Sequence, residues 1–182
     1  MRKIDLSGVQ EMKEFKRPKE GPFICKITKV IDHEQEEYLE IEYDIAEGEF
    51  KGYYTETRTA HPEWTWVGNY RQYYTEKSMP FFKAFCTSVS RSNGNFVFDA
   101  NKNADEQTLV GKLIGLNFGE EKYDGNDGNV KTVYKVRRTF AIGKIDEQTI
   151  PNPVDRTTKR PVTNFEDTMF VPAGTDEELP FA

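Results

Sequence analysis

The sequence predicts a mainly β domain that contains one helix and is followed by a polar C-terminal region. Residues 38–45 alternate with period two, which is typical of a strand with one buried face. Apolar residues after Ser78 instead recur at helical spacing. Beyond Lys144, prolines interrupt a polar stretch with little periodicity, as in chains that do not pack. We expect three parts: an N-terminal lead-in at 1–20, a folded domain at 21–145, and a flexible linker with an acidic tail at 146–182.

Three strands are expected before the helix. Residues 23–32 are rich in β-branched side chains, and an acidic turn at 32–37 leads from them into the strand at 38–45. One face of this second strand carries Leu39, Ile41, Tyr43 and Ile45, and the other carries Tyr38, Glu40, Glu42 and Asp44. Threonines at alternate positions predict a third strand over 50–59.

The helix and two further strands complete the predicted domain. Ser78 can cap the helix and Pro80 fits its first turn. The apolar face of the helix carries Phe81, Phe82, Phe85, Cys86 and Val89. A fourth strand at 112–122 and a turn at 124–129 then lead to a fifth strand at 130–142. Three strands, a helix and two strands follow the order of the OB fold, a five-stranded Greek-key barrel with a helix between strands three and four. Small α+β domains of other topology share that order.

The composition argues against a broadly basic nucleic-acid-binding protein. The 182 residues carry 25 basic and 31 acidic side chains, a net charge of −6, and residues 1–150 are still acidic. Any nucleic-acid site must therefore be a local patch. Cys25 and Cys86 stand in apolar patterns without a Cys-x-x-Cys motif, so we expect reduced thiols. No apolar run approaches about 18 residues, and the start lacks a hydrophobic signal region, which predicts a soluble, cytoplasmic protein with no membrane contact.

No catalytic constellation stands out in the sequence. His33 and His61 lie in separate turns with no Ser or Cys motif beside them. The acidic face of 38–45 could suggest a metal site, but a half-exposed strand produces the same spacing. The turn at Asp124 fails as a calcium loop, because Lys135 occupies the position of the bidentate Glu. We therefore expect no enzyme activity, no cofactor and no bound metal.

An aromatic and basic segment between Thr57 and Ser78 is the first candidate for binding single-stranded nucleic acid. An aromatic ring stacked on a base contributes about 1–3 kcal/mol to the binding free energy, and cationic side chains bind the phosphates. The candidate residues are Arg58, Trp64, Trp66, Tyr70, Arg71, Tyr73, Tyr74 and Lys77. For Trp66 and Tyr70, a loop that covers the core explains the sequence equally well.

The fifth strand carries the second candidate patch. Lys131, Lys135 and Arg137 fall on one strand face, and such cations gain free energy by releasing counterions from phosphates. An ordinary solvated strand face gives the same pattern. The acidic face of 38–45 opposes DNA at the usual OB binding surface. Three explanations stay open: the ligand is displaced toward the aromatic segment, the acids pair with neighbouring Lys or Arg side chains, or the domain binds something else.

The segment Asp176–Phe181 places three acids before Leu-Pro-Phe and cannot fold alone, because its few apolar side chains do not offset the entropy of ordering its backbone. Together with Gly21–Ile27, Tyr38–Ile45 and Pro80–Lys83, it resembles phage and prophage proteins of the single-stranded DNA-binding (SSB) type. Ala182 departs from the pattern of that family, in which Phe is the last residue.

That resemblance implies an OB fold that coats single-stranded DNA with little sequence preference during phage replication or recombination. It implies a location in the host cytoplasm and is compatible with a homo-oligomer. It also implies that replication or recombination proteins are recruited through the tail residues Asp176, Glu177, Glu178, Leu179, Pro180 and Phe181.

A second hypothesis belongs to another class. The acidic domain and the acidic second strand also fit a phage-encoded adaptor or inhibitor, in which an OB-like barrel grips a protein through its aromatic loop.

Overall fold

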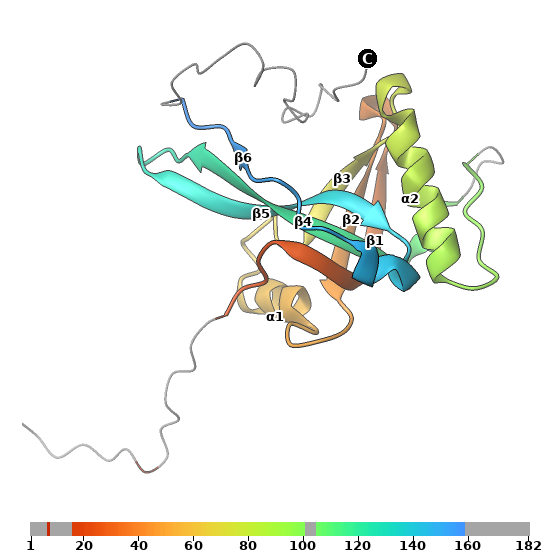
Figure 1. The fold of residues 1–182 in the computed structure, drawn as a ribbon, viewed down its shortest axis with the longest axis horizontal. Helices are drawn as coiled ribbons and strands as arrows, with labels where there is room; N and C mark the ends of the chain where they lie inside the picture. Colours follow the sequence, from red (N-terminus) through yellow and green to blue (C-terminus); the bar gives the residue numbers. More distant parts are fainter. Residues whose placement is uncertain (1–6, 8–15, 101–104, 159–182) are drawn as a thin grey trace, which may run out of the picture.

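The computed structural model describes residue 7 and residues 16–100 and 105–158, which form a mainly β arrangement with a few helices (Figure 1). The strands are β1 Gly21–His33, β2 Tyr38–Ile45, β3 Asn69–Tyr73, β4 Leu113–Asp124, β5 Val130–Phe140 and β6 Val154–Asp155. The α-helices are α1 Tyr53–Ala60 and α2 Met79–Ser92. Short 3-10 turns lie at 34–36, 76–78, 106–109 and 142–147.

The strands form one open antiparallel sheet in the order β3-β2-β1-β4-β5. β1 is the central strand, because its first half pairs with β4 and its second half with β2. β6 adds to the sheet by pairing in parallel with β4. As predicted, a helix, α2, lies between the third and fourth strands in the chain.

The predicted third strand at 50–59 is wrong. Residues Tyr53–Ala60 form α1, and the third strand is Asn69–Tyr73. The buried carboxylate of Asp44 accepts hydrogen bonds from the backbone amides of Tyr54 at 3.0 Å and Thr55 at 3.1 Å, which satisfies amides that the first helical turn leaves free. This tertiary cap outweighs the β propensity of the alternating threonines.

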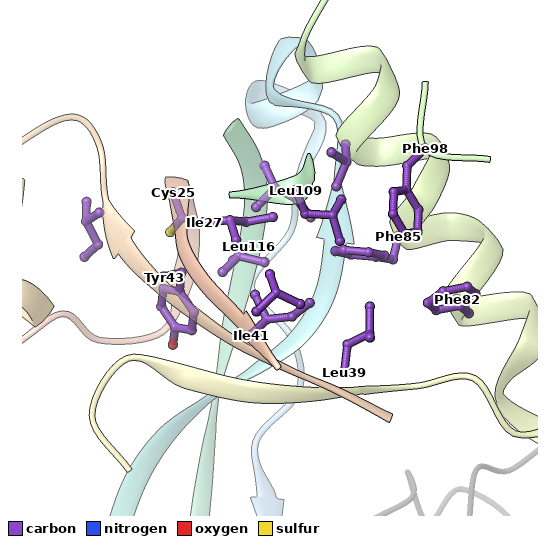
Figure 2. Packing of buried hydrophobic residues seen from close by; sticks show 14 of the residues in the cluster. Cys25, Ile27, Leu39, Ile41, Tyr43, Phe82, Phe85, Phe98, Leu109 and Leu116 are labelled. Atoms are coloured by element: carbon purple, nitrogen blue, oxygen red, sulfur yellow. The ribbon is translucent and has the colours of Figure 1, made fainter. Parts of the chain in front are cut away.

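The core lies between the inner face of the sheet and α2 (Figure 2). The period-two prediction is confirmed for the core face of β2, since Leu39, Ile41, Tyr43 and Ile45 are all buried. On the opposite face Glu40 and Glu42 are partly exposed, but Tyr38 and Asp44 are also buried, under neighbouring side chains and α1. From α2, Phe82, Phe85 and Val89 join this core, whereas Phe81 is 36% exposed. Cys25 is buried, Cys86 is half-buried, and both are free thiols.

Ordered packing continues beyond residue 145, where the linker was expected to begin. The Asn117 side-chain amide donates to the Thr149 carbonyl at 2.9 Å, and the Arg156 amide donates to the Lys122 carbonyl at 2.8 Å. The amide and the hydroxyl of Thr158 both donate to the Asp124 carboxylate. Residues 149–158 therefore run back along β4 (Figure 1).

We expect Asp44→Ala to lower the free energy of unfolding by about 1–3 kcal/mol, because it leaves partly buried amides at the start of α1 without their acceptor. Urea denaturation measures the change. Glu42→Ala is the matched control on the same strand, since its partly exposed ion pair with Lys29 should contribute less than about 1 kcal/mol. Equal losses for the two variants would contradict the capping role.

Candidate nucleic-acid interface

The side of β1, β2 and β3 that faces away from the core forms a grid of paired residues. Residues opposite each other in adjacent strands project from the same face. The grid, which we call the outer face, consists of Lys29, Ile31 and His33 on β1, Tyr38, Glu40 and Glu42 on β2, and Asn69, Arg71 and Tyr73 on β3. On β2, the opposite face of the strand carries the buried side chains Leu39, Ile41 and Tyr43.

A stack of rings and one guanidinium crosses this outer face. The guanidinium carbon of Arg71 lies 4.9 Å from the centre of the Tyr38 ring and 5.1 Å from that of Trp66. The ring of His33 stacks on that of Tyr38 with ring centres 4.5 Å apart, and the ring of Tyr73 packs against Tyr38 with ring centres 5.2 Å apart. Tyr38 is consequently only 8% exposed, whereas Trp66 is 64% exposed. Trp66 therefore presents an aromatic surface that is already oriented by the cation beneath it.

Both tryptophans of the chain belong to the loop at 61–68, between α1 and β3. Trp64 is 51% exposed and stacks on His61, with ring centres 4.0 Å apart and ring planes 8° apart. The loop is held by Arg58, whose guanidinium donates to the carbonyls of Val67 at 2.8 Å and Gly68 at 3.3 Å. Arg58 thus shapes the loop and does not present its charge to a ligand.

The acids of β2 are paired within the described part of the chain. Glu42 forms an ion pair with Lys29 at 3.3 Å, and Glu40 accepts hydrogen bonds from His33 and Asn69, both at 3.2 Å. Asp44 is buried beneath α1, as described above. Of the three explanations for the acidic strand, the geometry favours pairing with neighbouring groups. The partners are a histidine and an asparagine as well as a lysine.

Two of the predicted stacking tyrosines face the protein instead of solvent. Tyr70 packs against the core, and burial raises the pKa of its hydroxyl well above the ordinary value. Tyr74 packs on Phe82 with ring centres 5.6 Å apart and donates its hydroxyl proton to Asp32 at 2.7 Å. Burial first, and then that hydrogen bond, raise the pKa of Tyr74. Tyr73 stays on the outer face, and Lys77 is exposed in the turn before α2.

The predicted basic patch on β5 is organised around one buried acid. The carboxylate of Glu121, with its side chain 3% exposed, lies 2.7 Å from Lys135, 2.7 Å from Arg137 and 3.1 Å from Arg156. Burial opposes ionisation of Glu121, but the hydrogen bonds from Lys135 and Arg137 outweigh it and lower its pKa. Lys131 pairs separately with Asp127 at 3.3 Å. The patch keeps more cations than acids, but its lysines and arginines already have partners.

Sequence reasoning missed several residues of these two sites. The ring of Tyr38 was assigned to the outward side of its strand but not recognised as part of a stack with Arg71. The strand alternation carried that signal, because outward positions of neighbouring strands meet. Arg156 was missed because it follows the expected domain boundary, and no sequence signal indicated that β6 pairs with β4.

The predicted tail residues Asp176–Phe181 lie outside the described residues. Within residues 16–100 and 105–158, no group of three or more His, Cys, Asp or Glu side chains is arranged to hold a metal ion. In the same part of the chain, no helix has the length and apolar character needed to span a membrane. A scan against protein-family models found no matching family, and a search of curated proteins found no match.

The carboxylate of Glu121 should make stability depend on pH. A lowered folded-state pKa means that its contribution is present above the unfolded value of about 4.3 and is lost as pH falls through the folded value. We expect Glu121→Gln to lower the free energy of unfolding by about 1–3 kcal/mol at neutral pH. The difference in unfolding free energy between the native protein and the variant should become smaller in acid. Urea denaturation across a pH series measures it. Glu120→Gln, which breaks a partly exposed pair with Lys122, is the control, and a gap that stays constant with pH would contradict the assignment.

Arg58 and Lys77 should differ in how much they contribute to the stability of the fold. Arg58→Gln is expected to destabilise the protein by about 1–3 kcal/mol, because the carbonyls of the 61–68 loop lose their charged donor. Lys77→Gln removes the same charge at an exposed position and should leave stability nearly unchanged. Thermal melting of both variants provides the comparison, and a stable Arg58→Gln variant would show that the loop is held by other contacts.

Proposed function

We propose that this protein binds single-stranded DNA with little sequence preference, through the outer face and the tryptophan loop, on an OB-type barrel. The observation that carries the proposal is the stack of Trp66, Arg71 and Tyr38, with Trp66 64% exposed to solvent. The strand order β3-β2-β1-β4-β5, with α2 between β3 and β4, supports the OB-type interpretation. OB folds are partly open barrels that bind oligonucleotides across strands two and three.

Stacking supplies most of the affinity in this proposal. A base placed on Trp66 would continue the order ring, guanidinium, ring that already exists below it. Every base has a π face, so such binding tolerates any sequence. Lys29 and Arg71 on the outer face, with Lys122 and Lys131 beside the β4–β5 turn, supply positive charge near the proposed path of the phosphates. Because Lys29, Lys122 and Lys131 have acidic partners of their own, we expect phosphates to exchange with those acids.

The wider biological role is part of the same proposal. The protein acts without enzymatic activity in phage replication or recombination, in the cytoplasm of the host. The segment Asp176–Phe181 recruits replication or recombination proteins. The resemblance of that segment to SSB tails supports this part.

A second candidate function is supported by the charge balance. On the outer face Lys29 and Arg71 are balanced by Glu40 and Glu42, and on β5 Glu121 holds Lys135 and Arg137. A neutral surface with an exposed tryptophan is also suited to a protein contact. The alternative is therefore a phage-encoded adaptor or inhibitor that uses the same face to grip a protein.

A fluorescence titration with oligothymidine tests the proposal. Trp64 and Trp66 are the only tryptophans in the chain and lie in one loop, so tryptophan emission, excited selectively over that of the nine tyrosines, reports on this site. We expect quenching on binding, with affinity that falls as salt rises. Trp66→Ala should weaken binding roughly 5- to 150-fold, corresponding to the loss of about 1–3 kcal/mol of stacking. Anisotropy of a labelled oligonucleotide measures that variant.

Val97→Ala is the matched control, because Val97 is an exposed apolar residue (72%) outside the outer face and the tryptophan loop. Its affinity for oligothymidine should equal that of the native protein. If the native protein binds no single-stranded DNA at low salt, the proposal is wrong and the adaptor hypothesis takes its place.

A further inference from the structure

A groove separates α2 from the end of β5 and the turn that follows it. It has a volume of about 480 Å³, within the range of sites that hold small ligands or short peptide segments. The apolar residues that line it are Pro80, Ala84, Phe140 and Ala141. α2 packs on the core side of the sheet through Phe82 and Phe85, so this groove and the outer face lie on different sides of the β2 and β3 strands.

Three cations border the groove. Lys83 and Arg91 are exposed on α2, and Lys144 lies across from them in the turn after β5. Within residues 16–100 and 105–158, neither Lys83 nor Arg91 forms an ion pair. Lys144 pairs with Glu147 at 2.9 Å, but both side chains are more than half exposed, so this pair exchanges at little cost. The groove thus combines an apolar floor with a positive border in which, within the described part of the chain, only Lys144 has an ion-pair partner.

One segment of the same chain has the complementary composition. Asp176–Phe181 carries three acids followed by Leu-Pro-Phe, whereas the groove has three cations and an apolar floor. The dimensions also agree. Six extended residues span about 20 Å, and the α2 stripe from Pro80 to Arg91 spans roughly 16 Å at 1.5 Å per residue.

The connecting chain is long enough for this contact. Seventeen residues lie between Thr158 and Asp176, so the maximum span between these two residues is about 60 Å and the average reach of a random coil of this length is about 23 Å. A compact domain of this size has a radius of gyration of roughly 14 Å. Because both parts belong to one molecule, even a weak contact is favoured by a high effective concentration.

We propose that Asp176–Phe181 docks in this groove of its own molecule, with its acids against Lys83, Arg91 and Lys144 and with Leu179 and Phe181 on the apolar floor. The contact does not depend on DNA binding at the outer face. A protein that captures the same segment has to displace it from the groove first.

Amide chemical shifts of the full chain test the docking. The native protein is compared with the tail variant Asp176→Lys/Glu177→Lys/Glu178→Lys at low salt, without DNA. We expect differences at residues 83–91 and 139–144. In the groove variant Lys83→Glu/Arg91→Glu, the same tail changes should no longer alter these signals. Combining both sets of substitutions should restore them, because the charges are then complementary again.

Lys122→Glu/Lys131→Glu is the matched control, since it makes the same charge change at exposed positions of the β4–β5 hairpin. The tail-dependent shifts should persist in it. Shifts that are absent, or that fall on the outer face around Arg71, overturn the proposal. Shifts that weaken on dilution also overturn it, because they show that the tail of a second molecule occupies the groove. Failure of this experiment leaves the oligothymidine titration unaffected, so the two proposals can fail separately.

Discussion

The buried carboxylate of Asp44 is the contact on which the candidate interface depends. It caps α1 through the amides of Tyr54 and Thr55, and α1 in turn positions Arg58. Arg58 binds the carbonyls of Val67 and Gly68 and so fixes the loop that carries both tryptophans. Gly68 is required at this point, because a Cβ there would lie 2.6 Å from the Tyr54 side chain and the backbone has φ +66°. Asp44 therefore influences the position of Trp66 indirectly: it caps α1, α1 carries Arg58, and Arg58 holds the loop that places Trp66 over Arg71.

Internal charge neutralisation is the second organising feature. Carboxylates on a surface proposed to bind phosphates would repel them unless they are paired, and each acid of the outward face of β2 has a hydrogen-bond donor or cation beside it. On β4, in contrast, a single buried carboxylate, that of Glu121, pairs with three cations, Lys135, Arg137 and Arg156. Such a cluster costs desolvation energy, which is recovered only with good hydrogen-bond geometry. Its benefit is structural, because it joins β4, β5 and the chain after β6.

Much of the fold was predictable from the sequence, because local patterns determine it. The alternation in β2 predicted the side chains that face the core, and the spacing of Phe82, Phe85 and Val89 predicted the buried face of α2. The assignment of 50–59 failed because the helix cap is a residue in the preceding strand, and a pattern within the segment cannot reveal it. For the site, the sequence placed both tryptophans and Arg71 in one segment, and the structure brings Trp66 into contact with Arg71. The inward orientations of Tyr70 and Arg58 follow from tertiary contacts that no spacing rule contains.

The return of residues 149–158 along β4 has a geometric consequence. The chain leaves the described domain at Thr158, whose hydroxyl and amide are bound to Asp124 at the end of β4, next to the turn that leads into β5. The last described residue is therefore bound at the β4–β5 hairpin and not at the end of β5 near α2. A reporter group attached just after Thr158 would consequently sense events at the β4–β5 turn, although in sequence it lies closer to the turn at 142–147.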